Sequence, residues 1–375
     1  MQKIRILIVD DAVVVRRMLT DILDSDPDLE VVGTAANGKI ALNKLPQVKP
    51  DVMILDLDMP EMNGLETLAA VRKINHTLPI IAFSTMTERG ASKTLEALSR
   101  GATDYVTKPS TMRGARSAVD TIREELVPKV KAFGRRRRGP AQPAARPTHQ
   151  RPVVPRPVVP PKRPVAPRPV TPRGVGISRT GIQKYSVLAI GTSTGGPNAL
   201  ADLLPRLPPN FPVPIVIVQH MPPIFTRILA ERLTTASHLK VVEGSMGAVL
   251  QPGTAYIAPG DYHMTIARGS QTTVVTKTNQ NPPEHSCRPA VDVLFRSVAE
   301  VYKDKVLAVV LTGMGRDGAL GCAKIKQTGG GILAQDEASS VVWGMPGLVA
   351  KQGLAEKVLN LEGLADEITK RICGT

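Results

Sequence analysis

Residues 134–180 constrain the fold of this chain more than any other stretch, because they cannot form a packed core. They contain 12 Pro and 12 Lys or Arg, and no Asp, Glu, Phe, Tyr or Trp. Such a segment buries too little apolar surface to offset the entropy of ordering its backbone, which predicts a disordered or polyproline II linker. The chain of 375 residues is therefore expected to fold as two domains, at 1–133 and 181–375, joined by this linker.

The formal net charge of +15 also comes mostly from the linker. Its 12 cationic residues leave three of the fifteen positive charges to the rest of the chain, so both domains are nearly neutral. A solvated, self-repelling spacer is the simpler interpretation, and an electrostatic tether to an acidic partner, a membrane surface or nucleic acid is the alternative. The missing aromatic residues argue against a platform for base stacking.

Several features indicate a cytoplasmic chain that does not insert into a membrane. No apolar run approaches the roughly 20 residues that span a bilayer. The N-terminal residues enter a strand-like run directly, without the apolar core of a secretory signal. Cys287, Cys322 and Cys373 are odd in number and lack metal-ligand spacing, so neither a disulfide framework nor a zinc site is expected.

The first domain alternates short apolar runs with amphipathic stretches. A helical face is formed in 115–130 by apolar residues three or four apart, and another helix is predicted over Val14–Leu23. The predicted strands are Ile4–Val9, Val31–Ala35, Val52–Leu55, Ile80–Phe83 and Tyr105–Thr107. Five such strand–helix units in this length predict an α/β fold with a doubly wound parallel sheet, whose sites form at the carboxyl ends of the strands.

Carboxylates stand at those strand ends. Asp10 and Asp11 close the first predicted strand, and Asp56 closes the third. Converging acidic oxygens repel each other unless a cation joins them, and hard oxygen ligands suit Mg²⁺ beside a phosphoryl group. Ser84 and Lys108 follow the fourth and fifth strands, where they can donate to that group. Asp56 would then be the nucleophile that accepts the phosphoryl group.

This set of residues resembles the receiver domain of bacterial two-component response regulators. The matching positions are Asp10, Asp11, Asp56, Ser84, Tyr105 and Lys108. The resemblance implies a flavodoxin-like fold in which Asp56 takes phosphate from a histidine kinase with Mg²⁺ bound. It also implies that Asp58 lends a backbone carbonyl to the metal, and that Ser84 and Tyr105 report the phosphate to the surrounding face.

In the second domain, the apolar run Ser186–Ile190 leads into the glycine-rich turn Gly191–Pro197, and a helix is predicted over Asn198–Leu204. A strand, a glycine-rich turn and a helix can form a phosphate cradle at the helix N-terminus. The pattern Gly-x-Ser-x-Gly around Ser193 also fits a nucleophile on a sharp turn. The turn alone leaves both interpretations open.

Two further strand ends favour the nucleophile. Predicted strands Ile215–Val218 and Val306–Leu311 are followed by His220 and Asp317, so Ser193, His220 and Asp317 can meet at one edge of a parallel sheet. In such a triad, the His takes the Ser proton and the Asp holds the imidazole and stabilises its positive charge. The backbone N–H groups of Thr194 and Met314 are the candidates for an oxyanion hole. The chain order Ser, His, Asp differs from that of the α/β-hydrolases.

Other histidines and a cysteine compete for a role. His263 and His285 are predicted in loops that could contact substrate, and strand-end placement favours His220 over both. Cys287 lies in a proline-flanked loop without a neighbouring helix start, so we predict that it is incidental.

The second domain resembles the chemotaxis protein-glutamate methylesterase family. The resemblance rests on six strings in order: Gly-Thr-Ser-Thr-Gly-Gly, Gln-His-Met-Pro, Ile-Ala-Pro-Gly-Asp-Tyr-His-Met, Arg-Pro-Ala-Val-Asp-Val-Leu-Phe, Leu-Thr-Gly-Met-Gly-Arg-Asp-Gly and Gly-Met-Pro. It implies a Rossmann-like domain whose catalytic residues are Ser193, His220 and Asp317 and which needs no cofactor. The implied reactions are hydrolysis of glutamate γ-methyl esters on chemoreceptors, releasing methanol, and deamidation of receptor glutamines. Both pass through one kind of tetrahedral intermediate.

The family implies control by the receiver, whose unphosphorylated form would cover the active-site cleft. This sequence departs from the commonest family pattern at Thr192, which is often Ala, and at Cys287, which is often His. Because Thr85 follows Ser84, either hydroxyl could be the one that signals.

A receiver-controlled nucleic-acid regulator is the alternative suggested by the basic linker, although no C-terminal helix has a basic recognition face. A nucleotide-binding module would want a Walker-type Lys in Gly191–Gly196, which is absent.

Overall fold

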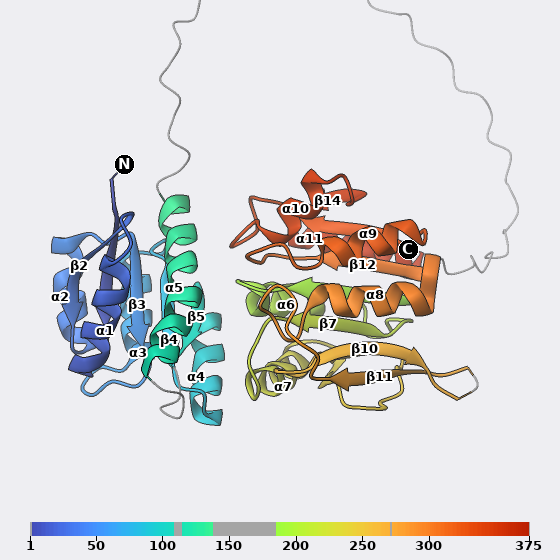
Figure 1. Cartoon of the computed structure of the whole chain (residues 1–375), viewed down its shortest axis with the longest axis horizontal. Helices are drawn as coiled ribbons and strands as arrows, with labels where there is room; N and C mark the ends of the chain where they lie inside the picture. Colours follow the sequence, from blue (N-terminus) through green and yellow to red (C-terminus); the bar gives the residue numbers. More distant parts are fainter. Residues whose placement is uncertain (1, 109–114, 138–184, 271, 375) are drawn as a thin grey trace, which may run out of the picture.

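Two parallel β-sheets, each covered by helices on both faces, form the two halves of the molecule (Figure 1). The structure is a computed structural model that describes residues 2–108, 115–137, 185–270 and 272–374. The predicted disorder of the Pro- and Arg-rich segment therefore falls almost entirely outside the described residues. No helix among the described residues has both the length and the apolar character needed to cross a membrane.

The N-terminal half is a five-stranded parallel sheet in the order β2-β1-β3-β4-β5. This order is that of a flavodoxin-like fold, which confirms the predicted fold class. The strands are β1 (Ile4–Val9), β2 (Leu29–Ala35), β3 (Val52–Asp56), β4 (Ile80–Ser84) and β5 (Asp104–Thr107). The helices are α1 (Val13–Asp24), α2 (Gly38–Val48), α3 (Gly64–Ile74), α4 (Glu88–Ser99) and α5 (Ala115–Arg137).

Local sequence explains these elements well. Strands β3 and β4 are buried along their whole length because helices cover both faces of the sheet, and they are accordingly continuous apolar runs. Helix α3 begins with a capping box, in which Asn63 and Glu66 each bond the other's backbone N–H. Helix α5 continues to Arg137, past residue 133 at which the sequence predicts the domain to end.

The C-terminal half is a seven-stranded sheet in the order β14-β13-β12-β6-β7-β9-β8, with all its strand pairs parallel. The strands are β6 (Val187–Thr192), β7 (Ile215–Gln219), β8 (Lys240–Glu243), β9 (Thr254–Ile257), β12 (Val306–Val310), β13 (Gly331–Gln335) and β14 (Lys357–Leu359). The helices are α6 (Gly196–Leu203), α7 (Phe225–Ala236), α8 (Val291–Tyr302), α9 (Ala319–Gln327), α10 (Met345–Lys351) and α11 (Leu361–Cys373), with short 3-10 helices at Leu204–Arg206 and Lys303–Lys305.

An antiparallel hairpin, β10 (His263–Arg268) with β11 (Val274–Asn279), lies outside this sheet. The prediction that His263 lies in a loop is therefore wrong: it is the first residue of β10 and is buried. Its Nε2 lies 3.1 Å from Pro282 O, and its Nδ1 accepts the backbone N–H of Ala290 at 3.2 Å. Both ring nitrogens are thus used to hold the chain segments that lead into α8.

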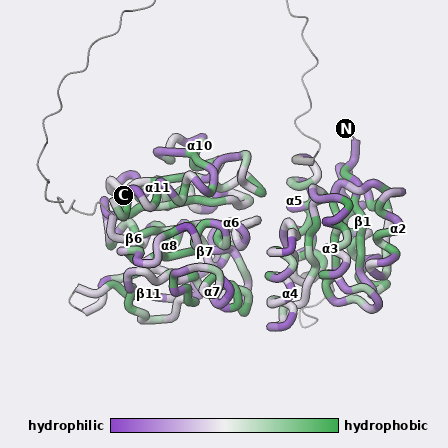
Figure 2. The backbone as a smooth tube through the Cα atoms, turned by 180° about the vertical axis from the view of Figure 1, so that it is seen from behind, coloured by the Kyte–Doolittle hydropathy of each residue, from purple (hydrophilic) through white to green (hydrophobic). Residues whose placement is uncertain are grey.

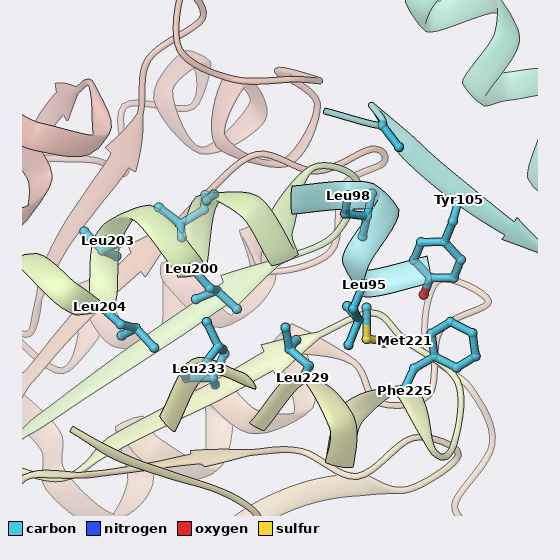
Figure 3. Close-up of a cluster of buried hydrophobic side chains, with 14 of the residues drawn as sticks. Leu95, Leu98, Tyr105, Leu200, Leu203, Leu204, Met221, Phe225, Leu229 and Leu233 are labelled. Atoms are coloured by element: carbon cyan, nitrogen blue, oxygen red, sulfur yellow. The ribbon is translucent and has the colours of Figure 1, made fainter. Parts of the chain in front are cut away.

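Hydrophobic residues gather in the strands and on the inner helix faces, as the green segments of Figure 2 show. One buried cluster continues across both halves of the molecule. From the N-terminal half it includes residues of α4 and β5, and from the C-terminal half residues of α6, α7 and the β7–α7 turn. Figure 3 shows the meeting point, where Leu95, Leu98 and Tyr105 face Leu200, Met221, Phe225 and Leu229.

Candidate functional site

Three adjacent strands bring the predicted catalytic residues to one edge of the C-terminal sheet. Strand β6 lies between β12 and β7, and the three run parallel. Ser193 directly follows β6, His220 directly follows β7, and Asp317 lies in the loop after β12. On opposite sides of β6 the chain crosses over in opposite directions, and such a switch point is where ligands bind in doubly wound sheets.

His220 and Asp317 form a buried pair. His220 Nε2 lies 2.8 Å from Asp317 Oδ2, and their side chains are 11% and 2% exposed. Burial raises the pKa of Asp317, but its bonds with His220 and with backbone N–H groups outweigh burial and leave the pKa below its ordinary value. Burial lowers the pKa of His220, whereas hydrogen bonds to Asp317 and Cys287 raise it, and the net shift is upward. The pair therefore stabilises an imidazolium next to a carboxylate.

Backbone donors surround the carboxylate of Asp317. Its Oδ2 accepts the N–H of Val291 at 2.6 Å, and its Oδ1 accepts the N–H groups of Asp292 and Gly318 at 2.8 and 2.9 Å. Val291 and Asp292 are the first two residues of α8, so the positive end of the helix dipole faces this anion. An ionised Asp317 can only accept, so the neutral ring of His220 carries its proton on Nε2 and leaves Nδ1 as the acceptor.

Hydrogen bonds to backbone atoms hold the loop around Ser193 against the neighbouring loops. Ser193 N donates to Thr312 O at 3.1 Å, and Thr192 Oγ1 donates to the same oxygen at 2.9 Å. The side-chain amide of Gln219 donates to both Ser193 O and His220 O, at 3.0 and 3.1 Å. One buried glutamine thus holds the two loops in register. Within the described part of the chain, the Ser193 hydroxyl has no hydrogen-bond partner, so Ser193 and His220 are not bonded through their side chains.

The two predicted oxyanion donors lie on loops that approach Ser193. Thr312 Oγ1 donates to Thr194 O at 2.9 Å, which joins the loop of Thr194 to the loop that carries Met314. A Cβ on Gly313 would lie 2.9 Å from Ser193 Cβ, so only glycine lets the loops come this close. Among the described residues, neither the Thr194 N–H nor the Met314 N–H donates to a protein acceptor. Both amides are free to bind a ligand oxygen.

Cys287, predicted from the sequence to be incidental, lies against the His220–Asp317 pair. Its Sγ is 3.5 Å from His220 Nδ1, the ring nitrogen opposite Asp317. His285 also lies close by, with Nε2 3.0 Å from Asp292 Oδ2. The departure at Cys287 from the family pattern was the only sequence sign of this position, and nothing in the sequence predicted the partner of His285.

The residues predicted to form a phosphorylation site in the N-terminal half also lie close together. The carboxylates of Asp10, Asp11 and Asp56 offer oxygens within 4.8 Å of one another. Lys108 Nζ lies 3.0 Å from Asp10 Oδ2 and 2.8 Å from Asp56 Oδ2. Burial raises the pKa of Asp56 to about 6 even though Lys108 lowers it. This crowded, partly buried group of acidic oxygens fits a small divalent cation.

The other predicted receiver residues lie around this group. Ser84 is buried at the end of β4, and its hydroxyl donates to Gly90 O in the first turn of α4 at 3.1 Å. The side chain of Asp58 pairs with Lys93 of α4. The backbone N–H of Asp58 donates to Asp56 Oδ1 at 3.2 Å. The backbone carbonyl assigned to the metal by resemblance remains a prediction. Tyr105 is buried, and its ring faces Phe225 of the C-terminal half.

The two sites are connected by the contact between α4–β5 and α6–α7. The rings of Tyr105 and Phe225 stack, and Asn198 Nδ2 donates to Leu98 O at 3.1 Å. Glu88 pairs with Arg227 across the contact, and Arg232 donates to Leu95 O. A cavity of about 420 Å³ remains between Ser99 at the end of α4 and the loops of Gly195 and Thr312. The N-terminal half therefore reaches the loop that follows Ser193.

Comparisons with known proteins identify the families to which the two halves of the chain are similar. The profile of the family described as CheB methylesterase matches residues 188–368, and that of the response regulator receiver domain matches residues 6–120. The protein-glutamate methylesterase/protein-glutamine glutaminase of Trichodesmium erythraeum (strain IMS101) is 49% identical, over 99% of this chain and 100% of that protein. The chain belongs to this family of methylesterases. A protein of the same name from Nocardioides sp. (strain ATCC BAA-499 / JS614) is 47% identical over 99% of this chain and 96% of its own length.

Solved structures of the family's domains cover the two halves of this methylesterase separately. The catalytic domain of the Thermotoga maritima CheB methylesterase is 43% identical over 50% of this chain and 98% of that chain, with a TM-score of 0.49. The response regulator domain of Thermotoga maritima CheB is 39% identical over 36% of this chain and 97% of that chain, with a TM-score of 0.33. Membership of a response-regulator methylesterase family confirms the resemblance stated from sequence and does not favour the nucleic-acid-binding alternative.

Proposed function

We propose that this chain hydrolyses glutamate γ-methyl esters on chemoreceptors and deamidates receptor glutamines, with Ser193, His220 and Asp317 as its catalytic triad. The observation that carries the proposal is the buried His220–Asp317 pair at the strand end beside Ser193, in a chain of the methylesterase family. Further support comes from the free N–H groups of Thr194 and Met314, which lie on the loops around Ser193. The proposed catalytic domain, 181–375, uses no cofactor.

In the proposed reaction, Ser193 Oγ attacks the ester carbonyl carbon and gives its proton to His220 Nδ1. That nitrogen is the acceptor because Nε2 donates to Asp317. The N–H groups of Thr194 and Met314 bind the oxyanion of the tetrahedral intermediate. The intermediate then loses methoxide, which takes the proton from His220 and leaves as methanol. Water attacks the acyl-enzyme by the same proton route and releases the glutamate carboxylate and Ser193.

Deamidation follows the same steps with a glutamine side chain as substrate. The leaving group is then ammonia, which needs the proton from His220 more than methanol does because an amide anion is the stronger base. Since the acyl-enzyme is identical in the two reactions, the second half of the reaction is shared. One triad is therefore sufficient for both activities.

We also propose that phosphorylation controls this activity. Asp56 is the phosphate acceptor, and Asp10, Asp11, Asp56 and the backbone carbonyl of Asp58 would hold Mg²⁺. The metal would neutralise charge on the transferring phosphoryl group. Lys108 is within ion-pair distance of Asp56 and stabilises the same charge from the protein side. A chemotaxis histidine kinase is the proposed phosphate donor.

The domain contact supports a mechanism for this control. In the docked arrangement, α4 covers the loops beside Ser193, so a methylated receptor helix must compete with the receiver domain for that side of the site. Phosphorylation would draw the Ser84 hydroxyl away from Gly90 O and loosen the start of α4, which carries the contact with α7. The active state is then the undocked one.

We also propose how the chain is divided and where it acts. The division of the chain is a receiver domain at 1–133, a linker at 134–180 and the catalytic domain at 181–375, with α5 extending a few residues into the linker. The chain acts in the cytoplasm on membrane-bound methyl-accepting receptors, without inserting into the membrane and without binding nucleic acid.

The deciding experiment measures methanol release from methylated chemoreceptor membranes. Intact chain and Ser193→Ala are compared, each with and without acetyl phosphate and Mg²⁺. We expect release that rises with acetyl phosphate and is lost in Ser193→Ala. Labelling of Ser193 by a serine-directed phosphonate in the absence of methanol release would point to the wrong receptor. Failure of both labelling and release would overturn the triad.

A further inference from the structure

A second His–Asp pair, His285 with Asp292, lies directly behind the catalytic pair. We propose that Asp292, together with His285, is a positioning residue that holds Asp317 and His220 in line. This inference rests on the proposed function and deepens it, because it assigns a role to residues that touch neither substrate nor the reacting atoms. The argument starts from the place of Asp292 in the fold.

Asp292 connects the two helices that enclose Asp317. Its backbone N–H donates to Asp317 Oδ1 at 2.8 Å, and Asp292 is the second residue of α8. Its side-chain Oδ1 accepts the N–H of Gly321 in the first turn of α9 at 2.6 Å. Asp317 lies two residues before α9. Asp292 therefore holds Asp317 both directly, from the start of α8, and through its bond to the start of α9.

Helices α8 and α9 are packed so closely that they cannot easily shift relative to each other. A Cβ on Gly321 would lie 2.4 Å from Phe295 Cβ, so α8 and α9 approach within contact of their backbones. Asp292 is fully buried, and burial raises its pKa while the N–H of Gly321 lowers it. A buried carboxylate in a helix interface is costly unless each oxygen has a donor. Asp292 has both donors, from Gly321 and His285.

His285 supplies the second donor and joins a third segment to the frame. Its Nδ1 faces Arg316 Nε at 3.3 Å, and because Arg can only donate, the His285 proton is on Nε2. Nε2 therefore donates to Asp292 Oδ2 at 3.0 Å. The ring thus bridges α8 to Arg316, the residue immediately before Asp317.

The backbone conformation at His285 indicates that tertiary contacts hold the loop of His285 in place. His285 and Ser286 have φ values of 52° and 61°, a left-handed conformation that non-glycine residues rarely adopt. The loop keeps it because the His285 ring is fixed at both nitrogens. Two residues further on, the same loop places Cys287 Sγ 3.5 Å from His220 Nδ1. The His285–Asp292 pair therefore acts on the catalytic pair from both sides, through Asp317 and through the loop over His220.

The carboxylates in this group are not free to bind a metal. His285, Asp292 and Asp317 have ligand atoms within 4.8 Å of one another, which is a spacing that a cation could use. However, Asp317 already accepts from His220 and three backbone N–H groups, and Asp292 from His285 and Gly321. A positioning network uses the same atoms without displacing any of these bonds.

The test compares full-length chains carrying Asp292→Asn, His285→Gln or the control Glu300→Gln. Glu300 is exposed on the same helix, away from the pair. Methanol release gives kcat and KM, and the NMR resonance of the His220 Nε2 proton, assigned with His220→Gln, reports the bond to Asp317. We expect kcat to fall by up to about 100-fold with KM little changed, and the proton to move upfield, in Asp292→Asn and His285→Gln but not in the control.

Other outcomes separate this inference from the proposed function. A change in KM alone, or an unchanged proton resonance with unchanged kcat, would overturn the positioning role. If the unaltered chain releases no methanol while the proton still moves in both variants, the positioning role stands and the proposed function fails. His285 has a side chain that is 20% exposed, so His285→Gln provides the test if Asp292→Asn does not fold.

Discussion

The ring of Tyr105, at the end of the receiver sheet, stacks on the ring of Phe225, at the start of helix α7 in the catalytic half. Their centroids are 5.2 Å apart and the planes are inclined by 12° (Figure 3). Tyr105 is the second residue of β5, the strand that Lys108 follows, and Phe225 lies a few residues after His220. This aromatic contact is one of those that join the two halves of the chain.

Replacing Tyr105 with alanine should raise the methylesterase activity of the unphosphorylated chain. An aromatic pair contributes about 0.5–1.5 kcal/mol beyond its buried area, and 1.4 kcal/mol is a factor of about ten in the docking equilibrium. We expect a roughly tenfold rise in methanol release without acetyl phosphate, if the docked state is the inactive one. Tyr105→Phe retains the stacked ring and should keep the activity low. Equal activity of the two variants would contradict a docked inactive state.

Ser84 is expected to transmit phosphorylation, whereas Thr85 is not. The Ser84 hydroxyl donates to Gly90 O in α4, and the Thr85 hydroxyl pairs with that of Thr87, the N-cap of the same helix. Ser84→Ala removes the donor that can turn to the phosphoryl group, so stimulation by acetyl phosphate should be strongly reduced. The measurement is the ratio of methanol release with and without acetyl phosphate. Loss of stimulation in Thr85→Ala instead would assign the signal to the other hydroxyl.

The pH dependence of kcat/KM should follow the raised pKa of His220. Burial lowers this pKa, but hydrogen bonds to Asp317 and Cys287 raise it above 6.5. A general base must be neutral, so activity should be lost as the pH falls through the raised pKa and should increase toward alkaline pH. A profile with its acidic midpoint at or below 6.5 would contradict the role of Asp317 as the partner of His220.

Asp317→Asn tests directly whether Asp317 raises the pKa of His220 and sets its tautomer. An Asn side chain that keeps its oxygen at the Oδ1 position still accepts the N–H groups of Asp292 and Gly318, so its amide nitrogen takes the Oδ2 position and faces His220 Nε2. That contact forces the imidazole proton onto Nδ1, which can no longer accept from Ser193. We expect kcat to fall by about 10⁴-fold and any remaining activity to titrate at a lower pH.

Much of this architecture is predictable from sequence for a simple physical reason. Buried parallel strands are continuous apolar runs, and the residues that follow them meet at one sheet edge. This predicts the places of Asp10, Asp56, Ser193 and His220 without knowledge of any loop, whereas Asp317 lies farther along the loop after β12. The same pattern fails for β10 and β11, because an antiparallel hairpin outside the sheet has only one buried face and lies next to Pro and Gly turns.

The contacts that sequence reasoning missed all depend on loops or on the meeting of distant surfaces. Cys287 reaches His220 only because two left-handed residues, His285 and Ser286, turn the loop back over the site. Tyr105 meets Phe225 only where the two halves of the chain pack together. Neither arrangement leaves a periodic pattern in the sequence, since each is determined by tertiary packing.

Gly313 should be required for catalysis because of its approach to the nucleophile. A Cβ at this position would lie 2.4 Å from Met345 Sδ and 2.9 Å from Ser193 Cβ. Met345 is buried and Ser193 N is bonded to Thr312 O, so Gly313→Ala must displace the nucleophile loop. A displacement on the order of 1 Å from the productive geometry costs about 100-fold in rate, which is the fall in kcat that we expect.

The control for this change is Gly33→Ala in strand β2. There an added Cβ would make only ordinary contacts, at 3.5 Å from Leu7 Cδ1 and from Val48 Cγ1. Methanol release and phosphonate labelling of Ser193 should both fall in Gly313→Ala and should both be retained in Gly33→Ala. Normal labelling of Gly313→Ala combined with lost methanol release would show that the added methyl blocks substrate rather than displacing Ser193. The close packing of the two loops would then serve to shape the substrate site.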